Sequence, residues 1–489
     1  MSDTQSTSST GLKIFKHVGP GLVTACVVIG PGSILTSSKV GAANGYSLGW
    51  IVVIACLCMM VYTTLGAKLG VISGQSTGKL LTDRAGRWVA AFIGVSVFFI
   101  ASAFQFGNNV GVHSAVQEYV NFDQIAEEKE LTPVVEALFK LSPIIIFNGV
   151  ALTFLFGFRN LYKVVERLMA MFVALMLIAF AINLFNAAPD PVEVAKGLIP
   201  LAGSEDQMSK LDLSVMGLVG TTFVIPAAFY QSYLVRFKGW KEGDLRDGLI
   251  DARVSATIMA LITLMLMYTA GSELRGQDLK GVGDVAAGLQ ETFREFGHLF
   301  FCLGLFAAAY SSFLVNSMIG GFMLADGLGL GSTPDDKWPR LLTAAVLLTG
   351  AAMGAYVVLS GNAPVPAIIA AQAVTVLAAP AVAAALWWLS NREDVMGAHR
   401  SGPLMNVLAG FGFVLLLGIA ANTAFNGIPS QIEKLRNPPA ETPAEPEEEQ
   451  ASLAPAGEGL LLVVRTQHDA GLADLWTSSG LSEAGYRWG

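Results

Sequence analysis

The chain of 489 residues is 53% hydrophobic and only 14% charged, with a formal net charge of −8. Soluble domains carry about a quarter charged residues, so this composition excludes an ordinary soluble enzyme. Apolar stretches of about 20 residues recur along the chain, and each can cross a hydrocarbon core. Because a spanning segment must satisfy its own backbone, these stretches are expected to be helices. The sequence predicts an all-α integral membrane protein whose surroundings are the lipid bilayer, with no cofactor and no nucleic-acid partner.

The first 17 residues are polar and contain no short apolar run with a cleavage site, so we expect an N-terminal arm and no removable signal peptide. Length and apolarity then predict eleven spans. They lie at residues 18–45, 48–71, 89–117, 143–157, 163–187, 212–236, 251–271, 296–325, 340–360, 364–389 and 403–425.

Two of these spans contain helix-breaking residues. The first is too long for one straight helix and holds Gly30-Pro31-Gly32 near its middle, and the sixth carries Pro226. Breaks five spans apart are typical of transporters built from two inverted five-helix repeats, in which the substrate binds where both helices unwind at mid-membrane. Two ordinary kinks are the alternative, since proline and glycine are frequent in membrane helices.

Lysine and arginine are concentrated in alternate loops, as in the loop 79–87 and the loop 236–246. This bias predicts a cytoplasmic N-terminus and, with eleven spans, a C-terminus on the opposite side. Residues 426–489 form an acidic segment rich in Pro, Glu and Ala, which is expected to be disordered. The predicted organisation is therefore an arm at 1–17, an eleven-helix transporter domain at 18–425 and a tail at 426–489.

Several motifs occur in the order found in the Nramp divalent-metal transporters, and the chain resembles that family over roughly residues 12–425. The matching segments are Gly19-Pro20-Gly21 with Gly30-Pro31-Gly32-Ser33, Gly41 to Tyr46, Lys68-Leu69-Gly70, Pro191 to Gly197, Gly220-Thr221-Thr222 with Pro226, Ala308 to Ser312, Gln372 with Pro380, and Met396-Gly397. The resemblance implies a LeuT-like fold, in which two inverted repeats are followed by an eleventh helix and helices 1 and 6 are unwound. It also implies secondary transport of metal ions.

The chain departs from that family at the positions that bind metal. Gly30 and Ser33 stand where the family has aspartate and asparagine, and Ile225 and Ala227 stand where it has methionine and histidine. Transition-metal selection needs soft or borderline ligands, and a dehydrated divalent ion needs nearby negative charge. Neither is present, so the metal ligands are unknown. The expected substrate site is neutral and comprises Gly30, Ser33, Thr36, Thr222, Ile225, Ala227 and Gln372.

The acidic residues that the family uses for protons in helix three fall here on Ala101 and Phe104, so proton coupling by that route is expected to be weak. Further polar residues in the spans have two interpretations each. Gln105, Asn108 and Asn109 either join helices or line the pathway in place of those acids.

Tyr230 and Tyr310 either pack in the core or line the pathway. Lys39 either extends to the membrane surface or attracts anions above the site. Glu166 and Asp251, near Arg167 and Arg253, are expected to form ion pairs at the membrane interface, with a gating role as the alternative.

The leading hypothesis is a secondary transporter that moves a metal cation by alternating access, and a hard or hydrated cation fits the neutral site better than manganese or iron. The same scaffold carrying a polar or anionic non-metal solute is a second hypothesis. A membrane sensor that does not transport is the third. An enzyme is not expected, because no nucleophile–base pair, phosphate loop or cluster of metal ligands is evident in the sequence.

Overall fold

The computed structural model describes residues 23–25, 28–157, 161–200, 213–279, 282–361, 371, 375–427 and 429. The side chains of 161–166, 170, 213, 282–283 and 286–298 are not among those described. The chain divides into two units, Met1–Asn437 and Pro438–Gly489, and every described residue belongs to the first. The predicted arm at 1–17, Gln372, the side chain of Glu166 and nearly all of the predicted tail lie outside the described residues.

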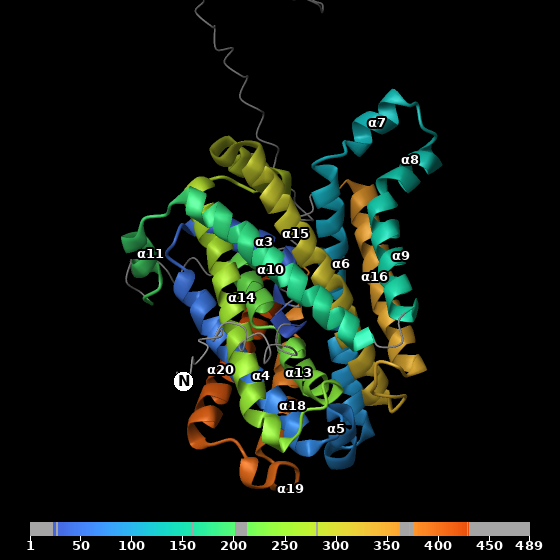
Figure 1. Ribbon diagram of the computed structural model, residues 1–489, viewed down its shortest axis with the longest axis vertical. Helices are drawn as coiled ribbons and strands as arrows, with labels where there is room; N and C mark the ends of the chain where they lie inside the picture. Colours follow the sequence, from blue (N-terminus) through green and yellow to red (C-terminus); the bar gives the residue numbers. More distant parts are fainter. Residues whose placement is uncertain are drawn as a thin grey trace, which may run out of the picture. The chain divides into compact units, whose positions relative to one another are not determined.

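The described residues are helical nearly throughout (Figure 1). The long helices are α4 (Gly49–Ser73), α6 (Arg87–Gln117), α9 (Ser142–Gly157), α10 (Leu161–Ala187), α14 (Leu245–Glu273), α15 (Val282–Leu328), α16 (Lys337–Ser360) and α20 (Pro403–Asn422). Shorter helices are α3 (Pro31–Asn44), α5 (Thr77–Ala85), α7 (Phe122–Glu128), α8 (Pro133–Lys140), α11 (Pro191–Gly197), α12 (Leu213–Thr222), α13 (Ile225–Phe237), α18 (Ala379–Asn391) and α19 (Glu393–Met396).

Eight helices in the described part of the chain are long and apolar enough to cross a membrane, and α8 with α9, bent by 52°, makes a ninth span. The predicted spans 18–45 and 364–389, which complete the set of eleven, run partly outside the described residues. Helices α14 and α15 begin at Leu245 and Val282, before the predicted spans at residues 251 and 296.

The predicted breaks in helices 1 and 6 are confirmed, and both lie just before a proline. Helix 1 is interrupted at Ile29 and Gly30, where Gly30 is extended with φ −124° and ψ 178°, and α3 then begins at Pro31. Helix 6 is interrupted between α12 and α13, three residues earlier than the Pro226 position suggested. Proline is favoured in the first turn of a helix because the N–H that it lacks has no partner there.

The two breaks lie at the same level of the bundle. Before the first break, the Thr24 hydroxyl donates to Gln231 Oε1 of α13 at 2.5 Å. After that break, α3 packs against α12, the other half of helix 6, and also against α6, α14 and α15. Helix 1 therefore contacts a different half of helix 6 on each side of its own break, which places the two unwound segments opposite each other.

One end of the bundle carries α5 and α19, and the other carries α7 and α8 (Figure 1). An ion pair between Arg84 of α5 and Asp394 of α19 joins two elements at the first end. The hydrogen bond from Arg392, together with the contact with Arg84, lowers the pKa of the exposed Asp394 carboxyl. The arginine- and lysine-rich loops that the sequence predicts to be cytoplasmic lie at this end.

Close approach of backbones fixes α4 against α13. A Cβ atom added at Gly66 would lie 2.1 Å from the Ala228 carbonyl oxygen, and one at Gly70 would lie 2.3 Å from that of Ser232. Small residues allow this kind of contact between membrane helices, where packing rather than hydrophobic burial drives association. These two glycines hold the second half of helix 6 in place beside the break.

We predict that Gly66→Ala destabilises the protein by about 1–3 kcal/mol, because the added methyl group collides with backbone that cannot turn away. The measurement is the thermal unfolding midpoint in detergent. Gly149→Ala in α9 is the matched control, since a Cβ there meets nothing within 4 Å. Equal midpoints for the two variants would show that the contact between α4 and α13 does not hold helix 6.

Candidate functional site

Side chains of helix 1 itself form hydrogen bonds with the backbone at and after its break. Ser33 Oγ accepts from Gly30 N at 3.1 Å and donates to the Gly30 carbonyl at 2.9 Å. The Thr36 hydroxyl donates to the Gly32 carbonyl at 2.5 Å. Both side chains are buried, with exposures of 3% and 0%. The two hydroxyls predicted to bind substrate therefore stabilise the local backbone and keep lone pairs for a further contact.

The break in helix 6 is equally devoid of charge. Thr222 donates to the Leu218 carbonyl at 2.7 Å, and Ile225 and Ala227 are completely buried. Pro226 has no N–H to give to the Thr222 carbonyl, which is four residues earlier. The predicted site residues Thr222, Ile225 and Ala227 lie at this break, and they offer carbonyl oxygen and apolar surface. Among the described residues, no group of three or more His, Cys, Asp and Glu could hold a metal ion.

A third wall comes from α6 and α15. A Cβ atom at Gly30 would lie 3.1 Å from both Asn108 Oδ1 and Ser312 Oγ. Asn108 Nδ2 donates to Ser312 Oγ at 3.1 Å and to Gln105 Oε1 at 3.2 Å. Of the two interpretations of the helix-three amides, the position of Asn108 fits the one in which they line the pathway, and Gln105 contacts Asn108. Ser312 was not predicted as a site residue, although its segment carried the resemblance in helix eight.

Asn109 has the other predicted role, joining helices. Its Nδ2 donates to the Gln105 carbonyl at 2.8 Å, and its Oδ1 accepts from Asn148 of α9 at 2.6 Å. Neighbouring amides on one helix thus face different ways, because successive residues are separated by 100° around a helix of 3.6 residues per turn. The structure does not place Asn109 against the break in helix 1.

Both predicted tyrosines lie in aromatic clusters. Tyr230 packs against Tyr233, Phe237 and Phe322. Tyr310 packs against four phenylalanines, namely Phe147, Phe172, Phe306 and Phe313. Neither hydroxyl has a hydrogen-bond partner among the described residues. The ring contacts agree with the packing interpretation, and the unpaired buried hydroxyls agree with the pathway interpretation.

The charged residues considered from the sequence have different surroundings. Lys39 Nζ lies 3.7 Å from Asp278 Oδ1, so its charge is paired near the end of α3. Asp251 was expected at the membrane interface beside Arg253. It is instead completely buried and accepts from Gln231 Nε2 at 3.5 Å, whereas Arg253 is exposed. The helical period turns these two residues, two positions apart, toward different sides of α14.

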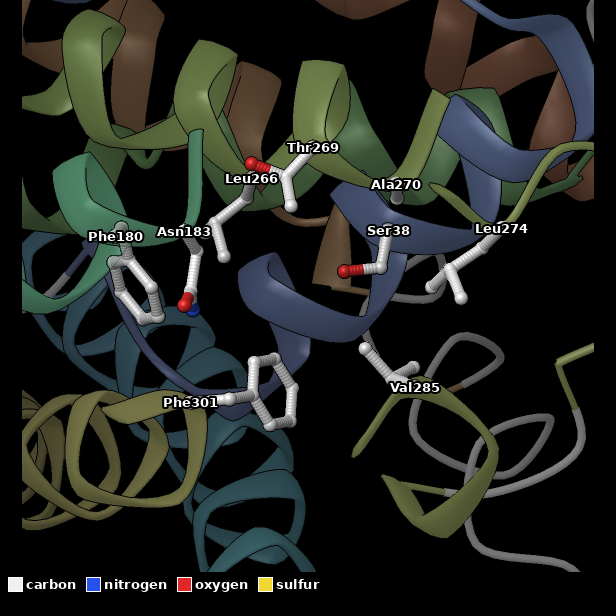
Figure 2. A pocket seen from close by; sticks show the side chains of 9 residues that line it. All are labelled: Ser38, Phe180, Asn183, Leu266, Thr269, Ala270, Leu274, Val285 and Phe301. Atoms are coloured by element: carbon white, nitrogen blue, oxygen red, sulfur yellow. The ribbon is translucent and has the colours of Figure 1, made fainter. Parts of the chain in front are cut away.

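A separate group of polar atoms lines a small cavity beside α3 (Figure 2). Ser38, Asn183 and Thr269 face a cavity otherwise lined by apolar side chains such as Phe180 and Phe301. Neither amide atom of Asn183 has a partner among the described residues. The cavity leaves about 10 Å³ for the centre of a water-sized sphere, which is room for one water molecule. This space is too small for a hydrated ion.

A buried carboxylate at the end of α15 was missed from the sequence. Asp326 accepts hydrogen bonds from Ser76 Oγ at 2.8 Å, Gly78 N at 2.8 Å and the Tyr233 hydroxyl at 2.6 Å. These bonds tie α15 to the start of α5 and to α13, at the end of the bundle that carries α5. The predicted eighth span ended at residue 325, so Asp326 was not counted as an acid within the membrane, which would have marked it as functional.

Two level breaks in a bundle of spanning helices define a membrane protein of the LeuT-like transporter fold. The crystal structure of the Eremococcus coleocola manganese transporter in complex with an aromatic bis-isothiourea substituted compound has a similar fold. It matches with a TM-score of 0.70 at 16% identity, over 89% of this chain and 91% of that one.

The model of the family "Natural resistance-associated macrophage protein-like", Nramp, matches residues 21–426, and the chain belongs to this family. The divalent metal cation transporter MntH of Deinococcus radiodurans is 23% identical over 402 residues, covering 79% of this chain and 84% of that protein. MntH of Verminephrobacter eiseniae is 26% identical, with coverages of 85% and 89%. The metal transporter Nramp2 of Populus trichocarpa is 25% identical, with coverages of 81% and 73%.

We predict that Asp326→Asn lowers stability by about 1.5–3 kcal/mol, the range for a hydrogen bond to a charged group. The amide offers one acceptor oxygen where the carboxylate offered two. Thermal unfolding in detergent measures the loss. The control is Asp335→Asn, because Asp335 is 68% exposed in its pair with Arg340 and exposed pairs contribute little. A loss no larger than that of the control would mean that the bonds to Asp326 do not stabilise this end of the bundle.

Proposed function

We propose that this Nramp-family chain is a secondary transporter that moves a metal cation across the membrane by alternating access. The site lies between the two unwound segments, and the cation keeps water molecules in its shell. A hard cation such as Mg²⁺ fits this site better than manganese or iron. The metal part of the proposal is supported by the relatives, which are named as divalent metal transporters.

The observation that carries the proposal is the neutrality of both breaks. Gly30, Ser33, Ile225 and Ala227 contribute no charge, sulfur or imidazole, and all four are buried. A fully dehydrated divalent ion in such surroundings would lose its hydration energy without compensation. Soft and borderline metals would also lack the ligands that select them. Mg²⁺ dehydrates reluctantly and usually keeps several waters, so neutral oxygens that contact those waters suit it.

The oxygens at the site are suited to bind through water. The Thr222 carbonyl has no N–H from Pro226, and Ser33 Oγ and Asn108 Oδ1 lie at the first break. Water bound to a cation directs its hydrogens outward, so it donates to carbonyl, amide and hydroxyl oxygens. Such bridged contacts are nearly as favourable in enthalpy as direct ones. Neutral acceptors of this kind hold a hydrated cation loosely enough to release it.

A polar or anionic non-metal solute on the same scaffold is the second candidate. One feature favours it: α3, with 14 residues, and α13, with 13 residues, both begin at the breaks. The N-terminus of a helix carries partial positive charge and attracts anionic groups in transporters of this architecture. The paired Lys39 adds little to this field. Competition by anions in the uptake experiment distinguishes the two candidates.

The orientation in the membrane is part of the proposal. Positively charged loops gather at the end that carries α5 and α19, so we place this end and the N-terminus on the cytoplasmic side. Eleven spans then place the C-terminus on the opposite side. The proposed organisation has the transporter domain at 18–425 and a tail at 426–489.

Purified protein in liposomes should take up Mg²⁺ and bind manganese and cadmium at least about tenfold more weakly than Mg²⁺, a difference of about 1.4 kcal/mol. Isotope or dye uptake and calorimetry on the same metals are the measurements. Gly30→Leu should abolish uptake, because its side chain would extend from a Cβ already 3.1 Å from Asn108 and Ser312 atoms. Gly149→Leu, in open space on α9, is the control and should transport normally.

Tight manganese binding by the unmodified protein would contradict the proposed selectivity. Uptake of an anion without any metal would favour the second candidate. Absence of uptake of every metal and anion, by protein that is folded and correctly inserted, would contradict transport itself.

A further inference from the structure

The space beside Gly30 is filled by side chains of two other helices. In the resembled family a carboxylate extends from this position, whereas here Asn108 Oδ1 and Ser312 Oγ each lie 3.1 Å from where the Cβ atom would be. Asn108 is 2% exposed and Ser312 is completely buried. Oxygen atoms from α6 and α15 therefore occupy the region that a side chain of α3 would otherwise reach.

The hydrogen bonds of Asn108 fix which of its atoms faces the break. The nitrogen donates to Ser312 Oγ at 3.1 Å and to Gln105 Oε1 at 3.2 Å. The oxygen is thereby turned toward Gly30. While these two donor contacts are kept, the acceptor of the amide is turned toward the unwound segment.

The neighbouring Gln105 provides an independent sign of a missing partner. It is completely buried, and its Nε2 has no hydrogen-bond partner among the described residues. Buried polar groups are nearly always paired, so the unpaired amide nitrogen of a residue that holds Asn108 indicates a ligand or water in the functioning protein. The cluster of Gln105, Asn108 and Ser312 thus has both an acceptor and a donor available at the site.

We propose that Asn108 Oδ1 and Ser312 Oγ form the third wall of the cation site and contact water molecules of the hydrated cation, with Gln105 as a positioning residue for Asn108. This inference rests on the proposed function. Neutral oxygens from α6 and α15 occupy the space that a carboxylate at position 30 would occupy. Neutral acceptors bind the water shell without replacing it, which makes Asn108 a determinant of selectivity against dehydrated transition metals.

Replacing the amide nitrogen of Asn108 by oxygen tests this assignment. Asn108→Asp has the same shape and places a negative charge next to Gly30. The new carboxylate retains donors, since the Ser312 hydroxyl can donate to it and a rotated Gln105 amide can present its unpaired Nε2. Asn109→Asp is the matched control, because it adds the same charge one residue away, where the side chain contacts the Gln105 carbonyl and Asn148.

Calorimetry with Mn²⁺ and Cd²⁺ on purified full-length protein is the readout. Asn108→Asp should bind either metal at least about tenfold more tightly than the unmodified protein, which corresponds to about 1.4 kcal/mol. Asn109→Asp should bind no better than the unmodified protein. No gain in folded Asn108→Asp, or an equal gain in both variants, would overturn the assignment.

A second variant keeps the test decisive if Asn108→Asp does not fold. Asn108→Ala should raise the KM for Mg²⁺ uptake about tenfold, because one contact to the water shell is lost. An unchanged KM would overturn the proposal. The two proposals fail separately: metal uptake without a gain in Asn108→Asp rejects this wall alone, whereas a gain without any uptake by the unmodified protein rejects the transport function and retains the site.

Discussion

The arrangement of this protein depends on two peptide units that cannot complete a helix inside a membrane. Pro31 and Pro226 lack the N–H that would donate to the carbonyl four residues earlier. In the hydrocarbon region no water is available to donate to such an unpaired carbonyl. Such irregular backbone is tolerated only where it is enclosed by protein or lines a hydrated cavity. The surrounding helices therefore have to cover both breaks, and the contacts of α3 with α6, α12, α14 and α15 do so for the first.

In the proposed function, chemical selectivity follows from the groups that lie at these breaks. Backbone carbonyls, the Ser33 hydroxyl and the Asn108 amide offer oxygen without charge. A neutral enclosure favours a solute that carries its own solvation, because neither the loss of a water shell nor an uncompensated charge is offset there. The same fold with an acid and a thioether at these positions would favour a dehydrated transition metal. Substrate class therefore depends on a few side chains, while the scaffold is unchanged.

The end of the bundle that carries α5 has a different kind of constraint. Asp326 gathers donors from α5 and α13 at the end of α15, and the close glycine contacts of α4 hold α13 beside it. These bonds link the second half of helix 6 to the scaffold on one side of the site. Alternating access requires that one such connection breaks while its counterpart forms, so a network of a few bonds suits the purpose better than a large apolar interface.

Much of the fold could be predicted from apolar length and from the positions of Pro31 and Pro226, because membrane helices have few alternatives to a regular backbone. The exact breaks could not, since proline can begin a helix as well as end one. Within the site, the neutrality of Gly30, Ile225 and Ala227 was evident from the sequence. The different directions of Asn108 and Asn109 depend on helix rotation, and the contact of Ser312 with Gly30 depends on packing between distant segments. Neither can be derived from one sequence.

The measurement that tests the central claim most directly is anomalous diffraction from crystals of the unmodified protein grown with Mn²⁺. A neutral site that contacts cations through water should show no anomalous peak within direct bonding distance of a protein oxygen between the break at Ile29–Gly30 and the break at Phe223–Val224. A strong peak there, within direct bonding distance of the Thr222 carbonyl or Asn108 Oδ1, would contradict the account and show that neutral oxygens suffice to bind a dehydrated transition metal.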